Sequence, residues 1–286
     1  MGKIPVSVIV ITKNEEARIG ACLEALKRFE EVWVVDSHSD DQTRDIARGC
    51  GAKVEIFIWD GRYPKKRQWC LDHLSLKHDR IFFVDADEIV QPALVNEIAA
   101  LDWSCPGYFV SGLYEFEGRV LKHGLRNNKL ALFDRHSVEF PVVDDLGLAG
   151  MGEIEGHYQP VLKAGFEAQA LGQLRVPMIH KAYENKESWL ARHQKYALWE
   201  AGMNARRAWP VDPKFSRQML KAVFRAMAFR SWAAFIHCYL FKLGFLDGRE
   251  GFEFARSRAR YYQMISDASK APVQLDESAR AATERL

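Results

Sequence analysis

Short apolar runs alternate with helical patterns through the first third of the chain. Runs rich in β-branched residues and bounded by polar ones predict buried strands at residues 6–11, 32–36, 53–57 and 80–84. Apolar residues recur at helical spacing in the segments 14–28, 39–51 and 64–76, with Asn14 and Ser39 as expected helix caps. This alternation predicts an α/β fold with a mostly parallel sheet flanked by helices, and ligands bound beyond the carboxyl ends of its strands.

The pattern changes after residue 105. Residues 106–174 are mixed and rich in glycine, which predicts an antiparallel extension with long loops. From Glu187 onward the chain is helical in pattern, with breaks at Pro210 and Pro213, and a polar tail follows. We therefore divide the chain into four parts, residues 1–105, 106–186, 187–269 and 270–286.

Composition is that of an ordinary folded protein, with 48% hydrophobic and 27% charged residues. A net charge of +2 gives no global bias toward charged partners, so any such partner must be recognised by a local patch. The five cysteines are widely spaced and include no C-x-x-C, which argues against a disulfide framework and a zinc knuckle. Since the first residues also lack the apolar run of a signal peptide, we expect a cytoplasmic protein.

Three polar clusters follow predicted strands, and the parallel sheet should bring them together. They are Thr12–Glu15, Asp36–Asp41 and Asp85–Glu88. In an extended segment Asp85 and Asp87 point the same way, so both can reach one divalent cation, or a cation and a ribose. A pair of solvated loop carboxylates is the alternative interpretation, because D-x-D is common by chance.

A carboxylate at the position of Asp36 is also typical of dinucleotide-binding dehydrogenases, where it binds a ribose hydroxyl. That alternative lacks support at the first turn, since residues 12–20 contain no G-x-G-x-x-G to admit a pyrophosphate. A basic cluster, Lys65, Lys66 and Arg67, suits phosphates, although Lys65 and Lys66 fit a solvated helix start equally well.

Taken together, three segments resemble family 2 glycosyltransferases of the GT-A fold: Ser7–Glu15, Val34–Thr43 and Val84–Glu88. Two further segments, Trp59–Trp69 and Gly244–Gly251, resemble the bacterial subgroup that builds lipopolysaccharide core or exopolysaccharide. The resemblance implies an inverting, metal-dependent hexosyl transfer from a nucleotide-sugar, with UDP as the expected nucleotide, to a lipid-linked or lipopolysaccharide-core glycan. It makes residues 1–105 the nucleotide-sugar half, 106–186 the acceptor half and 187–269 a membrane-associating helical region.

The resemblance also implies roles for single residues. Thr12, Asn14 and Glu15 would line the base and ribose pocket, and Asp36 would contact the nucleoside. The expected contacts to ribose, phosphates and a Mg²⁺ or Mn²⁺ ion come from Lys65, Arg67, Asp85, Ala86 and Asp87. Gln68 departs from the asparagine that is usual beside the basic residue.

An inverting transfer needs a base that removes the proton of the acceptor hydroxyl. The candidates lie in a glycine-rich acidic segment, where we rank Glu153 and Asp145 ahead of Glu155 and Asp144. An ordinary surface acid is the alternative for each. His180 is a candidate metal or phosphate ligand, with a hydrogen-bonded structural histidine as its alternative.

The C-terminal helical region contains no acidic residue between Asp212 and Asp247. Arg217, Lys221 and Arg225 fall on one predicted helix face, and the other face is apolar: Leu220, Val223, Phe224 and Met227. The pattern predicts a basic amphipathic segment, 214–242, that lies on an anionic membrane surface.

Four aromatic residues of this segment would then lie at headgroup depth: Trp232, Phe235, Tyr239 and Phe241. Packing of these aromatics on the catalytic domain is the alternative, and nucleic-acid binding has no recognised motif in its favour. For the whole chain, a non-catalytic membrane-associated scaffold and, less favoured, an NAD-dependent dehydrogenase are the alternatives to a glycosyltransferase. Binding of a nucleotide-sugar together with a divalent cation would distinguish them.

Overall fold

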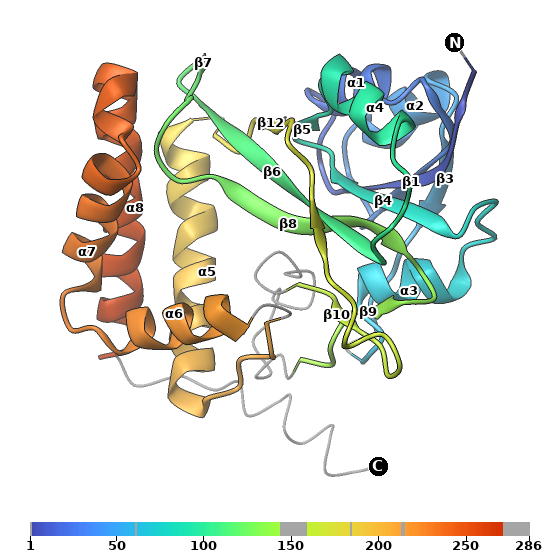
Figure 1. The fold of residues 1–286 in the computed structure, drawn as a ribbon. Helices are drawn as coiled ribbons and strands as arrows, with labels where there is room; N and C mark the ends of the chain where they lie inside the picture. Colours follow the sequence, from blue (N-terminus) through green and yellow to red (C-terminus); the bar gives the residue numbers. More distant parts are fainter. Residues whose placement is uncertain (1, 61, 144–158, 184, 213–214, 271–286) are drawn as a thin grey trace. The chain divides into compact units, whose positions relative to one another are not determined.

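The structure is a computed structural model that describes residues 2–60, 62–143, 159–183, 185–212 and 215–270. The chain forms two compact units. Unit 1 comprises residues 1–115, 126–140 and 159–182, and unit 2 comprises residues 116–125, 141–158 and 183–286. Most elements of both are labelled in Figure 1. The four-part functional division of the sequence stays a prediction.

Unit 1 is built on a mixed sheet. In spatial order its strands are β3 (Lys53–Ile56), β2 (Phe29–Asp36), β1 (Ile4–Thr12), β4 (Arg80–Asp85), β8 (Asn127–Asp134), β6 (Gly107–Phe116), β12 (Met178–His180) and β5 (Glu88–Ile89). Its shorter strands are β9 (Val138–Glu139), β10 (Val161–Leu162) and β11 (Gly172–Gln173), and β7 (Arg119–Val120) belongs to unit 2. β9 and β10 pair with each other, and β11 pairs with β6.

The first four strands of the sheet path are parallel, as the sequence predicts. β8 then lies antiparallel between β4 and β6, which is the predicted antiparallel extension. β12 runs parallel to β6, so β1, β2, β4 and β12 all end at the same edge of the sheet. The predicted α/β class with a mostly parallel sheet is confirmed.

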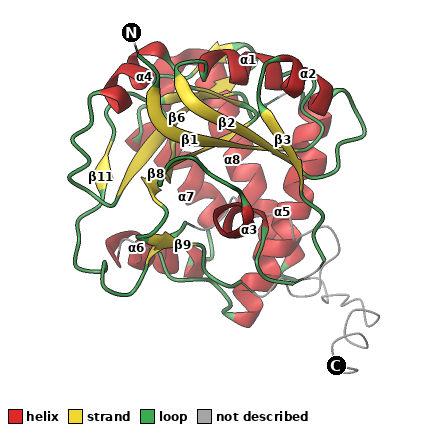
Figure 2. Ribbon diagram, turned by 90° about the vertical axis from the view of Figure 1, so that its right-hand side faces the viewer, coloured by secondary structure: helices red, strands yellow, loops and turns green. Residues whose placement is uncertain are grey.

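The helices of unit 1 are α1 (Ile19–Ala25), α2 (Thr43–Gly49), α3 (Lys66–His73) and α4 (Pro92–Ala99). Figure 2 shows α1, α2 and α4 along one side of the sheet and α3 on the other. The predicted caps are wrong, because α1 and α2 begin after Arg18 and Gln42 and neither residue makes a side-chain cap. Asn14 and Ser39 bond to neighbouring loops instead.

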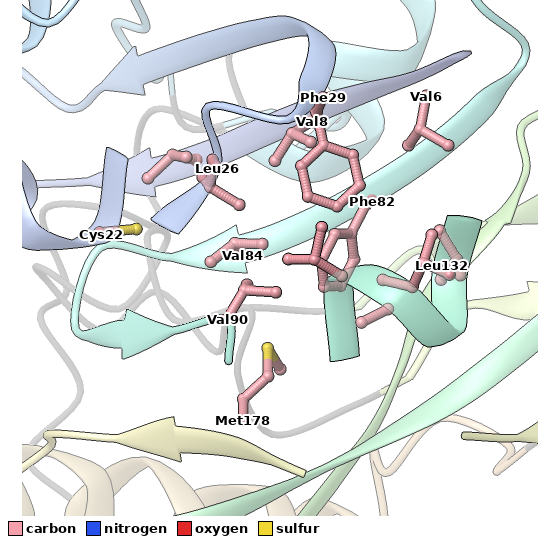
Figure 3. Packing of buried hydrophobic residues seen from close by; sticks show 14 of the residues in the cluster. Val6, Val8, Cys22, Leu26, Phe29, Phe82, Val84, Val90, Leu132 and Met178 are labelled. Carbon is pink, nitrogen blue, oxygen red and sulfur yellow. The ribbon is translucent and has the colours of Figure 1, made fainter. Parts of the chain in front are cut away.

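Alternate residues of β1 pack into the core beneath α1 and α4. Val6 and Val8 lie there with Cys22 of α1, Leu26 directly after α1 and Phe82 of β4, all fully buried (Figure 3). Both faces of the central strands are covered, since Ile9 on the opposite face of β1 is also fully buried. The β-branched sequence of residues 8–12 of β1 follows from this double burial.

Unit 2 is helical in its C-terminal part. Its elements are α5 (Lys186–Arg206), α6 (Phe215–Ala226), α7 (Arg230–Ile236), the π-helix η1 (His237–Phe241), the 3₁₀ helix η2 (Gly244–Asp247) and α8 (Gly248–Ala268). α5 and α8 pack through a cluster that includes Trp189, Tyr261 and Ile265. Tyr261 donates a hydrogen bond of 2.8 Å to Glu200, which satisfies that buried carboxyl group.

The segment Gly244–Gly251 forms a close junction between η2 and α8. Buried Asp247 accepts hydrogen bonds from the backbone N–H groups of Lys122 and His123, at 3.1 and 2.7 Å. A Cβ atom on Gly251 would lie 2.0 Å from the carbonyl oxygen of Gly244, so only glycine fits there. These contacts account for Gly251 and Asp247 of this segment.

None of the helices in the described residues has both the length and the apolar character needed to cross a bilayer.

Candidate functional site

The three polar clusters converge at the carboxyl edge of the sheet, as expected. Strand register pairs Thr12 with Asp36 and Ile11 with Asp85, so the ends of β1, β2 and β4 lie side by side. His180 joins them as the last residue of β12, and β5, which begins at Glu88, pairs with that strand. In parallel α/β sheets this edge is where ligands bind.

Asp85 lies in a network of buried charges. Its two carboxylate oxygens accept hydrogen bonds from Arg67 Nη2 at 2.7 Å and from Lys129 Nζ at 2.8 Å. Lys129 also donates to Glu88 Oε2 at 2.5 Å, and this oxygen accepts the backbone N–H of Asp85 at 2.9 Å. Arg67 comes from α3 and Lys129 from β8, so two separate elements hold the D-x-D segment in place.

Burial and charge act in opposite directions on these carboxyl groups. Burial raises the pKa of Asp85, but Lys129 and Arg67 outweigh it and hold this pKa far below its ordinary value. The pKa of Glu88 is raised instead, because burial and the nearby Asp85 outweigh the attraction of Lys129. The same cluster of charges thus lowers the pKa of Asp85 and leaves the pKa of Glu88 raised.

Asp87 faces His180 across the edge. Asp87 Oδ2 lies 3.3 Å from His180 Nε2, and the imidazole stacks on the ring of Tyr114 with centroids 5.2 Å apart. Burial lowers the pKa of His180, but the Asp87 carboxylate outweighs it and raises the pKa to about 9. The pair is thus a carboxylate and an imidazolium at neutral pH.

Asp36 is fully buried and shapes the turn after β2. Its oxygens accept hydrogen bonds from Ser39 Oγ at 2.5 Å and Ser39 N at 2.8 Å, and Arg44 Nε lies 3.8 Å away. The carboxylate therefore fixes the second polar cluster. Its predicted contact with a nucleoside stays a prediction.

The turn after β1 is bonded to the same cluster. Asn14, at a positive φ of 54°, donates its N–H to Ser39 Oγ at 2.8 Å and accepts the N–H of Asp40 at 2.9 Å. Glu15 forms a bidentate ion pair with Arg18, at 2.6 and 3.0 Å. These contacts hold the two turns as one surface.

Lys65 and Lys66 are only 3% and 4% exposed, so the interpretation of a solvated helix start is wrong for both. They follow a cis peptide bond between Tyr63 and Pro64, at the start of α3. Gln68, in the first turn of α3, accepts the N–H of Phe140 at 2.9 Å and so has a structural contact within unit 1.

Several side-chain atoms at this edge are buried without a hydrogen-bond partner among the described residues. They are Thr12 Oγ1, Ser37 Oγ, Glu88 Oε1 and His180 Nδ1. Buried polar groups in folded proteins are nearly always bonded, and groups that are not tend to mark a place where a ligand or water binds. This edge therefore has the polar character of a binding site.

Within the described part of the chain, no group of three or more His, Cys, Asp or Glu side chains is arranged to hold a metal ion. A site for Mg²⁺ or Mn²⁺ needs fewer, because one or two protein carboxylates and the substrate's phosphates commonly share such an ion. Asp87 and His180 provide a carboxylate and an imidazole 3.3 Å apart, which fits this requirement. Both oxygens of Asp85 already accept hydrogen bonds from cationic groups, which favours Asp87 as the ligand.

The candidate bases Glu153, Asp145, Glu155 and Asp144 lie outside the described residues. Ala86 is buried between the two aspartates and faces the core beneath α1. Lys129, which bonds to Asp85 and Glu88 at this edge, is the residue of the candidate site that the sequence did not indicate. Its only trace in the sequence is a single lysine at the start of the apolar run Leu130–Phe133, and its partners depend on strand register.

Comparisons with known proteins agree with this geometry. Residues 7–137 match the family described as glycosyl transferase family 2. An uncharacterized glycosyltransferase of Rickettsia bellii is 40% identical over 94 residues, 32% of this chain and 31% of that protein. The lipopolysaccharide core biosynthesis glycosyltransferase LpsC of Rhizobium meliloti is 35% identical over 97 residues, 32% of this chain and 35% of that protein. The chain thus aligns with about a third of the length of these relatives.

A solved structure shows the same fold over most of the chain. The mannosyltransferase PcManGT of Pyrobaculum calidifontis, in complex with GDP-Man and Mn²⁺, is 17% identical with a TM-score of 0.51. The alignment covers 94% of this chain and 87% of that one. With its mixed sheet and the motifs at its carboxyl edge, the chain carries a family 2 glycosyltransferase domain of the GT-A fold in residues 7–137.

Proposed function

We propose that the protein is an inverting glycosyltransferase that transfers a sugar from a nucleotide-sugar to a lipid-linked or lipopolysaccharide-core glycan. It would act in the synthesis of bacterial cell-surface polysaccharide, at the cytoplasmic face of the plasma membrane. The observation that carries the proposal is the set of unpartnered polar atoms at the carboxyl edge, which lie beside an ordered pair of acids, Asp85 and Asp87. The similarity to LpsC supports the class of acceptor.

Different residues at this edge would bind different parts of the nucleotide-sugar donor. Thr12 Oγ1 and Ser37 Oγ offer hydrogen bonds to the nucleoside, next to the turns that Asn14, Glu15 and Asp36 shape. Lys65 and Arg67, at the start of α3, provide positive charge for the phosphates. UDP-sugars are the first donors to test.

Asp87 and His180 would hold a Mg²⁺ or Mn²⁺ ion at this edge. Such an ion neutralises the charge that develops on a departing nucleoside diphosphate. The imidazole binds a metal only in its neutral form, so cation binding would release the proton that Asp87 now stabilises on His180. Asp85 and Glu88 keep the segment in place through Lys129.

The test is binding of a panel of nucleotide-sugars with Mn²⁺ or Mg²⁺, followed by transfer to bacterial lipid extracts. Asp87→Asn should lower metal-dependent nucleotide binding about 100-fold and abolish transfer. Asp79→Asn is the matched control, because Asp79 pairs with Arg135 at the opposite end of β4 and should leave both unchanged. Unchanged turnover in Asp87→Asn, or a wild-type protein that binds no nucleotide-sugar with either cation, would contradict the proposal.

A further inference from the structure

Helix α6 presents an apolar face to solvent. Its exposed residues are Phe215, Ser216, Met219, Leu220, Ala222, Val223 and Ala226. Their spacing places them along one side of the helix, and Ser216 is the single polar member. Phe215 and Leu220 are 77% and 72% exposed, values that are unusual for large apolar side chains gathered on one face.

The charged face of α6 lies against its own unit. Asp212 binds Lys221 Nζ at 2.6 Å and lies 3.3 Å from Arg217 Nε. Arg225 stacks on Trp209 at 3.7 Å, and Phe224 packs on a ring of α8. The helix is therefore the reverse of an ordinary surface helix, whose polar face is solvated and whose apolar face packs on protein.

A second apolar stripe follows along α7 and η1. Phe229, Trp232, Ile236 and Leu240 are exposed at helical spacing, and Phe241 is exposed beside them. Of the four aromatic residues that the sequence analysis placed at headgroup depth, only Trp232 and Phe241 are exposed. Phe235 and Tyr239 pack on Phe252 of α8 instead.

We propose that the exposed face of α6, with the stripe of α7 and η1, inserts into the acyl region of a lipid bilayer. Apolar contact provides the main attraction, and the half-buried Arg217 and Lys221 at the border of the face lie at the depth of the lipid phosphates. This differs from the sequence-based prediction, in which the cations themselves face the membrane. The inference deepens the proposed function and rests on its lipid-linked acceptor.

Charge favours lipid over a second copy of the chain. No acidic residue lies between Asp212 and Asp247, and Asp212 already pairs with Arg217 and Lys221. A symmetric dimer through α6 would therefore bring cations of one copy against cations of the other. Lipid phosphates complement these cations, and acyl chains complement the uncharged face between them.

The experiment is flotation of the full chain with phosphatidylcholine vesicles, with and without phosphatidylglycerol. We expect binding to both, retained within about threefold in about 0.5 M NaCl, since apolar contact is little screened by salt. Val223→Glu should weaken binding at least about tenfold. Leu198→Glu on α5 is the matched control, since Leu198 and Val223 are 59% and 60% exposed, and it should bind like wild type.

Three results would overturn the inference: binding that needs phosphatidylglycerol and is lost in salt, equal binding by Val223→Glu and wild type, or a stable dimer that Val223→Glu dissociates. Deletion of residues 271–286 should leave binding unchanged, and a gain on deletion would show that the tail covers the face. Nucleotide binding by Val223→Glu should equal that of wild type. Failure of membrane insertion is thereby distinguished from failure of sugar transfer, which the Asp87→Asn variant reports.

Discussion

Replacement of Lys129 by methionine should destabilise the protein more than any other loss of a single charge at the sheet edge. The ammonium group lies 2.8 Å from Asp85 and 2.5 Å from Glu88, and the Glu88 side chain is completely buried. Removal of one partner from a buried ion pair costs about 3–5 kcal/mol. Arg67 still binds Asp85 in the variant, so we expect the lower end, about 3 kcal/mol.

Urea unfolding at neutral pH, followed by circular dichroism, measures this loss. Glu88→Gln removes the second charge but keeps an oxygen for the Asp85 N–H, so the double variant should lose about 1–2 kcal/mol less than the sum of the single variants. Lys27→Met is the matched control, because Lys27 pairs with Glu24 on the solvated surface and should unfold like wild type. A loss below about 1 kcal/mol for Lys129→Met, or strict additivity, would refute the reasoning.

Two further predictions concern other parts of the chain. Gly251→Ala should lower the free energy of unfolding by about 2–3 kcal/mol, because the added Cβ meets the Gly244 carbonyl oxygen, whereas Gly49→Ala in α2 has open space and should raise it by up to about 1 kcal/mol. Hydrogen bonds from Lys53 and other donors outweigh burial and lower the pKa of Glu31 from 4.5 to about 2, so its stabilisation is complete above pH 4.5 and is lost as the pH falls toward 2. Glu31→Gln should therefore unfold more easily at pH 7 by about 1–2 kcal/mol after solvent screening, and equal loss at pH 7 and pH 2 in urea titrations would contradict this assignment.

The strands of the sheet could be predicted from sequence because both of their faces are buried. Val8 and Ile9 lie on opposite sides of β1, and each is fully buried, so residues 8–11 had to be apolar throughout. The predicted starts of α1 and α2 were wrong for a physical reason. Asn14 and Ser39 have the composition of caps, but their hydrogen bonds join two loops that are 25 residues apart. Local sequence cannot distinguish a cap from such a bond.

The residues of the candidate site also divide into those that the sequence could predict and those that it could not. The acids at strand ends could be predicted because strand order alone brings them to one edge. Lys129 could not, since its position beside Asp85 depends on the antiparallel insertion of β8 between β4 and β6. For α6 the periodicity predicted two faces, but the assignment of Phe224 to the apolar face is wrong, because Phe224 packs on Tyr262 of α8. Contacts with Asp212 and Trp209 decide which face is covered.

Lys129 lies on β8, late in the sequence of unit 1, and this position has a consequence for the nascent chain on the ribosome. β1 to β4 and the acids at their ends emerge first, and Lys129 follows Asp85 by 44 residues. Until β8 docks on β4, Asp85 and Glu88 lack their shared cation, and β4 is an open edge whose backbone groups are unpaired. The carboxyl edge of the sheet therefore forms in two stages, and a nascent chain halted before residue 127 contains all three polar clusters of this edge but lacks the cation that Asp85 and Glu88 share.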